Sequence, residues 1–148
     1  MKPYLNKIFA IVFMTLAFSS CSNDDDNAIT PTANELEGLT KFKEISNDTH
    51  TIELFSQMGA TQQGYNEIKL RIKDKTTNQY LKNATVSWMP KMHMAMMTHS
   101  CPYSEVKKIT ADGTLYEGYI MFQMAQNETE YWDLKIDYTV DDVAYTAT

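Results

Sequence analysis

The sequence predicts an all-β protein built as a single antiparallel immunoglobulin-like β-sandwich of about seven strands. In segment 67–73 the apolar residues Ile68, Leu70 and Ile72 alternate strictly with charged residues, the pattern of a strand with one buried face. Short segments of this kind recur along the chain, with turn-forming residues between them. After the N-terminal leader, no segment shows the period of a helix longer than one turn. Short strands at this spacing are typical of an immunoglobulin-like sandwich.

The strands follow one another with short turns between them. We expect strands at 51–55, 67–73, 84–88, 105–109, 115–124, 131–138 and 143–147, with 105–109 the weakest. Side chains that hydrogen-bond their own backbone mark turns at 74–78, 111–113, 126–128 and 141–142. Because 111–113 and 141–142 each lie between two consecutive strands, both are expected to be hairpin turns.

The N-terminus has the features of an export signal. Lys2 and Lys7 precede an apolar stretch, 8–18, that is too short to cross a bilayer and suits the hydrophobic region of a signal peptide. The stretch ends in Phe18-Ser19-Ser20-Cys21, which resembles the lipobox of bacterial lipoproteins, although Phe18 stands where leucine is usual. The resemblance implies a signal peptide at 1–20, cleavage before Cys21, and a lipid on the Cys21 thiol that anchors the protein to a membrane.

A flexible acidic tether is expected between the lipidated cysteine and the domain. Residues 21–40 include Asp24, Asp25 and Asp26 and lack periodic hydrophobicity, and the sandwich domain is expected at 41–148. Acidic residues close to the lipidated cysteine resemble the surface-export signal of some Gram-negative lipoproteins. We therefore expect an outer-membrane lipoprotein of the cell envelope, with periplasmic and surface-exposed orientations both open.

Charge and cysteine content limit the possible partners. Without residues 1–20 the chain has 11 basic and 19 acidic residues, so its net charge is 11 − 19 = −8. Nucleic acid is therefore not an expected partner. With lipid on Cys21, Cys101 has no intramolecular disulfide partner in an oxidising compartment, and ligation of a soft metal is one reason to keep such a thiol.

A methionine-rich segment carries the functional hypothesis. Segment 89–101 combines five thioethers, two imidazoles and one thiol, and it contains no carboxylate. These donors suit copper, most of all Cu(I). A core strand would use Val, Ile, Phe or Tyr, which are absent there, but packing and an adaptable peptide-contact surface remain alternatives. The candidate metal ligands are Met89, Met92, His93, Met94, Met96, Met97, His99 and Cys101.

The geometry of this segment restricts which ligands can meet. Pro90 is expected to end the strand before it, which makes 89–101 a long loop or an edge. In one extended strand, alternation places Met92, Met94 and Met96 on one side and His93, Met97, His99 and Cys101 on the other. A metal site therefore requires a segment that wraps around the ion, or a choice between the two sides.

Other chemistry is less well supported by the sequence. Zinc is the alternative metal, with His93, His99 and Cys101 as three ligands. No histidine follows Cys101, as a blue-copper centre would require, and no Gly-x-Ser-x-Gly or His-Glu-x-x-His motif is present. We therefore do not expect an enzyme. The competing hypothesis is a non-metal, surface-exposed module that binds a protein or glycan partner.

Three motifs resemble a known group of exported domains. Segments 88–94, 113–124 and 132–136 are similar in type and order to the Met-Pro-x-Met, Gly-x-Tyr and Trp-x-Leu motifs of YtkA-like and FixH-like small β-sandwich domains. The resemblance implies copper handling or assembly of copper oxidases, a copper-donor or copper-acceptor protein as partner, and Met121 and Met124 as further candidate ligands. The chain departs from FixH-like proteins in having a lipobox instead of a transmembrane helix.

Overall fold

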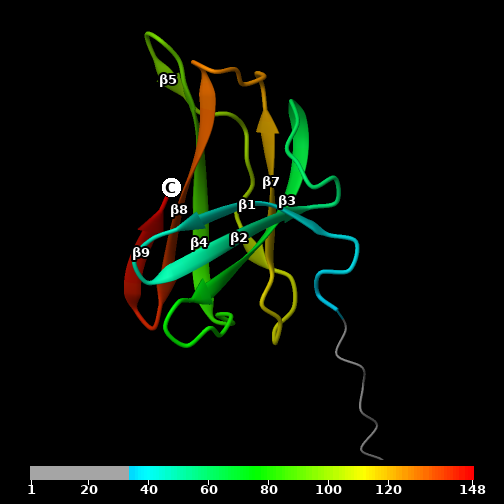
Figure 1. Cartoon of the computed structure of the whole chain (residues 1–148), viewed down its shortest axis with the longest axis vertical. Helices are drawn as coiled ribbons and strands as arrows, with labels where there is room; N and C mark the ends of the chain where they lie inside the picture. The colour runs from blue at the N-terminus through cyan, green and yellow to red at the C-terminus, as the bar shows by residue number, and fades with distance from the viewer. Residues whose placement is uncertain (1–33) are drawn as a thin grey trace, which may run out of the picture. The chain divides into compact units, whose positions relative to one another are not determined.

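The alternating segment predicted at 67–73 is the centre of strand β3 (Gly64–Asp74), whose even-numbered residues from Asn66 to Ile72 are buried. The structure is a computed structural model that describes residues 34–148, and it shows two antiparallel sheets packed face to face (Figure 1). The predicted signal peptide, Cys21 and the acidic residues of the tether lie outside these residues. Among residues 34–148, no helix is long and apolar enough to cross a membrane.

Nine strands make up the two sheets. Their bounds are β1 Thr40–Ser46, β2 His50–Ser56, β3 Gly64–Asp74, β4 Ala84–His93, β5 Thr98–His99, β6 Lys107–Lys108, β7 Tyr116–Phe122, β8 Tyr131–Val140 and β9 Val143–Ala147. One sheet has the order β1-β2-β3-β7-β6 and the other β5-β4-β8-β9. Without the edge strands β1 and β5, the first sheet has the order β2-β3-β7-β6 and the second the order β4-β8-β9. These correspond to the ABED and CFG sheets of an immunoglobulin sandwich. The predicted fold class is confirmed.

Each of the seven predicted strands overlaps a strand of the structure. The two strands that were not predicted are β1, which carries several charged residues, and β5, which is short. β5 has only two residues. In β1 only Ile45 is buried, because β1 is an edge strand that pairs with β2 alone, and a strand of this kind has no strict apolar alternation. The hairpin turns at 111–113 and 141–142 are confirmed, since β6 pairs with β7 and β8 with β9. Asp141 and Asp142 both have positive φ, as a two-residue hairpin turn requires.

The expectation that Pro90 ends the preceding strand is wrong. Strand β4 continues through Pro90 to His93. The Pro90 carbonyl accepts a hydrogen bond of 2.7 Å from Ser100 Oγ, so it points away from β8. In an extended strand the amide nitrogen of a residue points to the same side as its carbonyl. The N–H that proline lacks would therefore point away from β8, and the ladder between β4 and β8 loses nothing at Pro90.

The core lies between the sheets. Trp88 of β4 is buried and packs against Gly118 of β7, where an added Cβ would lie 2.6 Å from Trp88 Cζ2. The Trp88 indole also donates a hydrogen bond of 2.9 Å to the Ser104 carbonyl. The rest of the core is aliphatic and aromatic, from both sheets: Ile52, Leu54, Ile68, Leu70, Ile72, Val86, Tyr116, Ile120, Ile136 and Tyr138.

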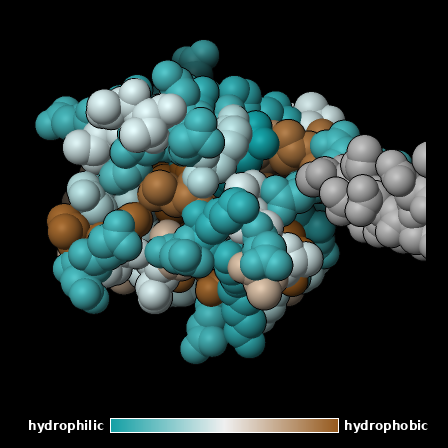
Figure 2. Space-filling model, turned by 90° about the horizontal axis from the view of Figure 1, so that it is seen from below, coloured by the Kyte–Doolittle hydropathy of each residue, from teal (hydrophilic) through white to brown (hydrophobic). Residues whose placement is uncertain are grey.

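The first described residues are attached to the end of the sandwich opposite the β4–β5 hairpin. Both carboxylate oxygens of Glu35 accept hydrogen bonds from Thr114, one from its backbone N–H at 2.8 Å and one from its hydroxyl at 2.6 Å. Thr114 belongs to the loop before β7, at the bottom of Figure 1, whereas β5 is at the top. Seen from below, the described residues present mostly hydrophilic side chains (Figure 2).

Candidate metal centre

The methionine-rich segment forms a tight hairpin between β4 and β5. Met92 pairs with His99 and His93 with Thr98, and the backbone N–H of Met94 donates a hydrogen bond of 3.0 Å to the Met97 carbonyl. Ala95 and Met96 are the two residues at the tip. The expected long loop is therefore a strand, a short turn and a second strand.

The turn brings together candidate ligands that a single strand would separate. Residues directly opposite one another in an antiparallel pair have their side chains on the same face of the sheet. His99 therefore lies on the face of Met92, which is the face toward the core, and the same register places Met94 and Met97 on that face. Alternation along one straight strand, which separated Met97 and His99 from Met92 and Met94, does not hold across the turn.

These four side chains differ in depth. Met92 is completely buried, Met94 and His99 are half-buried, and Met97 is 61% exposed. The group thus extends from the core edge to the surface near the hairpin tip. Such a gradient gives an ion access from solvent at one end and a dry environment at the other.

His99 is held with one ring nitrogen available. Its Nδ1 lies 3.0 Å from the Ser100 carbonyl oxygen, which accepts only, so Nδ1 carries the hydrogen. In the neutral imidazole Nε2 then has the lone pair needed to bind a metal. Histidine ligands are commonly oriented by a bond of this kind to a backbone carbonyl. The ring also meets Trp132 of β8 edge-on, with 5.6 Å between ring centroids.

His93 lies on the opposite face of the hairpin and has other partners. Its Nε2 is 2.7 Å from a carboxylate oxygen of Asp133, and its ring stacks on Tyr131 at 5.0 Å. His93 pairs in register with Tyr131, so all three side chains belong to the outer face of the sheet. The structure does not bring His93 to the face of His99.

Cys101 belongs to the hydrophobic core. It is buried, and it is the cysteine that the described residues contain. Burial raises the pKa of its thiol, so the protonated form predominates at neutral pH. The thiolate is the form that binds metals, and a buried protonated thiol is typical of a core residue.

The remaining candidate methionines are dispersed. Met89 is on the outer face of β4, and Met96 at the hairpin tip is 94% exposed. Met121 is on the outer face of β7, in the other sheet, opposite Tyr65. Met124 follows β7, and its carbonyl accepts a hydrogen bond of 3.0 Å from the Trp132 indole. The structure gives Met89, Met96 and Met121 no place on the face of Met92, whereas Met124 lies next to Trp132.

In residues 34–148, carboxylate, imidazole and thiol groups do not form a metal site without help from methionine. Among residues 34–148, no three His, Cys, Asp or Glu side chains are close enough together to hold an ion. The three zinc candidates His93, His99 and Cys101 are thus not gathered. The set of Met92, Met94, Met97 and His99 differs from such a cluster because three of its four donors are thioethers.

Trp132 is a neighbour of this site, a proximity that no sequence pattern predicted. On its inner side it contacts Phe122 at 5.0 Å between ring centroids, and it lines a pocket between the two sheets. Nothing in the sequence relates it to His99, because their proximity depends on the register of β8 with β4 and of β4 with β5. No protein-family model, curated protein or solved structure matches this chain.

Proposed function

We propose that this protein is a cell-envelope lipoprotein whose β4–β5 hairpin binds Cu(I) for trafficking, buffering or delivery of copper. The observation that carries the proposal is the register of the hairpin. It assigns three methionines and one histidine to one face, namely Met92, Met94, Met97 and His99.

The chemistry of these donors favours Cu(I) over harder ions. Thioether is a neutral, soft donor and imidazole a neutral, borderline one, and a site with three of the first and one of the second suits a monovalent soft cation. A thioether has no proton to lose, so copper binding by Met94 or Met97 needs no deprotonation. Methionine side chains are also flexible, so they can adapt to an ion without moving the backbone.

The position of the hairpin supports transfer of copper to another protein. Met96 and Met97 are exposed at the tip, where a copper-donor or copper-acceptor protein can approach. Glu35, near the start of the domain, is held at the other end of the sandwich. The hairpin is therefore at the end of the domain opposite Glu35, which is among the first described residues.

The resemblance to YtkA-like and FixH-like domains points to the same function, since those proteins are associated with copper handling. We propose the outer membrane of a Gram-negative cell as its location, because the lipobox-like sequence predicts lipidation and the acidic residues after Cys21 resemble an export signal of Gram-negative lipoproteins. We do not propose catalysis, because Cys101 is buried and its raised pKa keeps the thiol protonated, whereas a nucleophilic cysteine needs the thiolate.

A contact surface for a protein or glycan is the second candidate function. Met89, Met96, Met97 and Tyr131 are all at least 45% exposed, which suits an adaptable apolar contact. The two functions differ in their dependence on sulfur. Leucine matches methionine in volume and polarity, so methionine-to-leucine changes preserve a contact surface but remove metal ligands.

The test is a competition titration with Cu(I), under anaerobic reducing conditions, against a chromophoric copper chelator. The protein used is residues 27–148, which contain every strand of the sandwich. We expect one tightly bound Cu(I), lost in M94L/M97L and kept in the control M89L/M121L. Zn(II) should compete poorly. Equal copper binding by the two double variants, or none by the parent domain, contradicts the proposal.

A further inference from the structure

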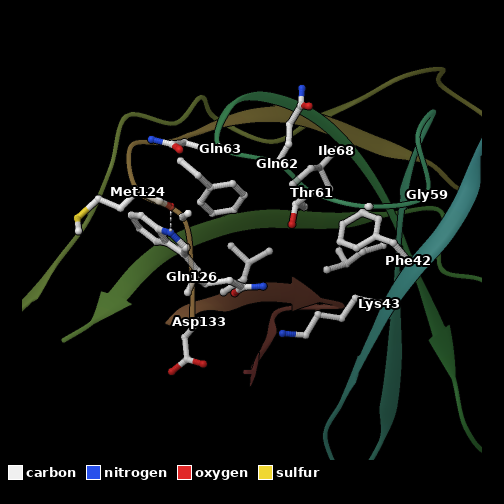
Figure 3. Close-up of a pocket in the computed structure, with 16 residues that line it drawn as sticks. Phe42, Lys43, Gly59, Thr61, Gln62, Gln63, Ile68, Met124, Gln126 and Asp133 are labelled. Atoms are coloured by element: carbon white, nitrogen blue, oxygen red, sulfur yellow. Dashed lines mark hydrogen bonds between the residues drawn. The ribbon is translucent and has the colours of Figure 1, made fainter. Parts of the chain in front are cut away.

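A pocket of about 510 Å³ opens between the two sheets on the inner side of Trp132. Loop 59–63, which leads into β3, forms one wall of its mouth, and residues 124–126, which follow β7, form another (Figure 3). β1 and β8 close the remaining sides. Its volume is within the range of small-molecule sites in proteins.

The floor of the pocket is apolar. Leu54 and Ile68 of one sheet and Leu134 of the other are buried and face the pocket, together with Phe122. Figure 3 shows aromatic rings along the sides of the pocket. A ligand that fills this space must therefore present a hydrocarbon or aromatic body.

The mouth has a small number of polar groups that face the opening. In Figure 3 the side chains of Lys43, Thr61 and Gln126 extend toward it, whereas the carboxylate of Asp133 points away. Asp133 is already paired with His93. Lys43 makes no ion pair with any carboxylate of residues 34–148, although the chain is acidic. Lys43 therefore leaves one positive charge at the mouth with no partner.

The walls are held open by hydrogen bonds. The buried Asn66 side chain accepts one from Gln62 N–H and donates to the carbonyls of Gln62 and Gly64, each at 2.8 Å. On the other side, the Trp132 indole holds Met124. Because both loops are fixed to the sandwich, the pocket is formed before any ligand arrives.

We propose that this pocket binds a small amphipathic monoanion, with its apolar body between the sheets and its carboxylate at Lys43. Thr61 and Gln126 supply further donors to the same headgroup. The site is separate from the proposed copper ligands, since none of Met92, Met94, Met97 and His99 lines the pocket.

The test uses decanoate as the probe and residues 27–148 as the protein, with binding measured by isothermal titration calorimetry. We expect one decanoate per domain and a change in Trp132 fluorescence. Lys43→Gln should weaken binding about twofold to fivefold, the loss expected for an ion pair made by an exposed lysine. Lys82→Gln, an exposed lysine elsewhere, is the matched control and should leave binding unchanged. Decan-1-ol should bind equally to the parent and to Lys43→Gln.

A second variant tests the location without disturbing the core. Thr61 is exposed on the mouth loop, so Thr61→Trp should fill the opening and abolish decanoate binding while the melting temperature stays the same. The proposal is overturned if the parent domain does not bind decanoate. It is also overturned if Thr61→Trp still binds decanoate, or if Lys43→Gln binds it as tightly as the parent does. Lys43→Gln should bind Cu(I) normally, so the pocket and the copper site succeed or fail separately.

Discussion

Met92 and His99 lie directly opposite each other across the β4–β5 hairpin, so the thioether of a fully buried residue and an imidazole near the surface occupy one face of the sheet. The next inward-facing pair, Met94 and Met97, continues that face to the tip. A two-residue turn thus converts a linear run of donors into a group. This relationship, together with the soft character of the donors, underlies the copper proposal.

The two histidines of the hairpin provide a matched pair for testing the site. His99→Gln removes the nitrogen proposed as a ligand, whereas His93→Gln removes a ring bonded to Asp133 on the other face. We expect Cu(I) affinity to fall at least about tenfold in His99→Gln, which is about 1.4 kcal/mol, and to stay within about twofold in His93→Gln. Chelator competition measures both. The opposite order of effects would place the ion on the outer face.

Cys101 should be chemically inert in the folded protein. Burial raises the pKa of its thiol and shields it from reagents, so a disulfide reagent should modify it slowly in buffer and at once in denaturant. Cys101→Ala should bind Cu(I) as the parent does. Rapid modification of the native protein, blocked by Cu(I), would instead make the thiol a ligand.

A buried carboxylate should contribute strongly to stability. Glu53 accepts hydrogen bonds from Arg71 at 2.6 Å, from Lys41 at 3.2 Å and from the Tyr80 hydroxyl at 3.2 Å. Burial alone would raise the pKa of Glu53, but the bonds from Arg71 and Lys41 outweigh it and the pKa is lowered. The stabilisation that Glu53 gives to the folded domain is fully present above pH 4.5, the ordinary pKa of a glutamate. It is lost as the pH falls through the lower pKa that Glu53 has in the folded state.

We expect Glu53→Gln to destabilise the domain by about 1–3 kcal/mol, because it leaves Arg71 without its charged partner. Urea unfolding at neutral pH measures the change. Glu44 is a suitable control, since its pair with Lys41 is exposed and Glu44→Gln should cost at most about 0.5 kcal/mol. Similar losses in the two variants would show that the Glu53 cluster adds no more than a surface ion pair.

Stability should also decline in mild acid because of His50. His50 is buried, with its ring edge-on to Tyr145 at 4.7 Å and to Tyr138 at 5.5 Å. Burial lowers the pKa of His50 below 6.5, against the opposing effect of Asp74. The unfolded chain therefore takes up a proton near pH 6.5, whereas the folded chain does so only at lower pH. Its stabilising contribution is complete above pH 6.5 and is lost as the pH falls to the folded-state pKa.

The measurement is the melting temperature between about pH 7.5 and pH 5, a range that spans the ordinary pKa of histidine. The parent should lose stability across this range, and His50→Gln should show a flatter profile even if its melting temperature is lower throughout. A parent profile as flat as that of His50→Gln would mean that His50 is not kept neutral by burial.

The local patterns of the sequence determined the fold class but not the details of the functional hairpin. Alternation in β3 and turn residues such as Asp141 and Asp142 are local properties, and they predicted strands and turns that the structure contains. β1 was missed because an edge strand buries little and can carry charges such as Lys43 and Glu44. Pro90 gave a wrong strand end, since its compatibility with β4 depends on which side faces β8.

The candidate ligands were identified by their chemistry, while their grouping depends on long-range structure. Donor types alone selected segment 89–101, but which donors share a face was set by a two-residue turn with no glycine at its tip. The position of Trp132 beside His99 and the pocket behind it follow from sheet register. The pairing of β8 with β4 and of β4 with β5 cannot be predicted from a local sequence pattern.

The most direct test of the copper site is X-ray absorption spectroscopy at the copper edge on the Cu(I)-loaded domain. The proposed site predicts a copper environment of sulfur neighbours from Met92, Met94 and Met97 and one imidazole nitrogen, with the nitrogen lost in His99→Gln. A spectrum with only nitrogen and oxygen neighbours, or one unchanged in M94L/M97L, would contradict it.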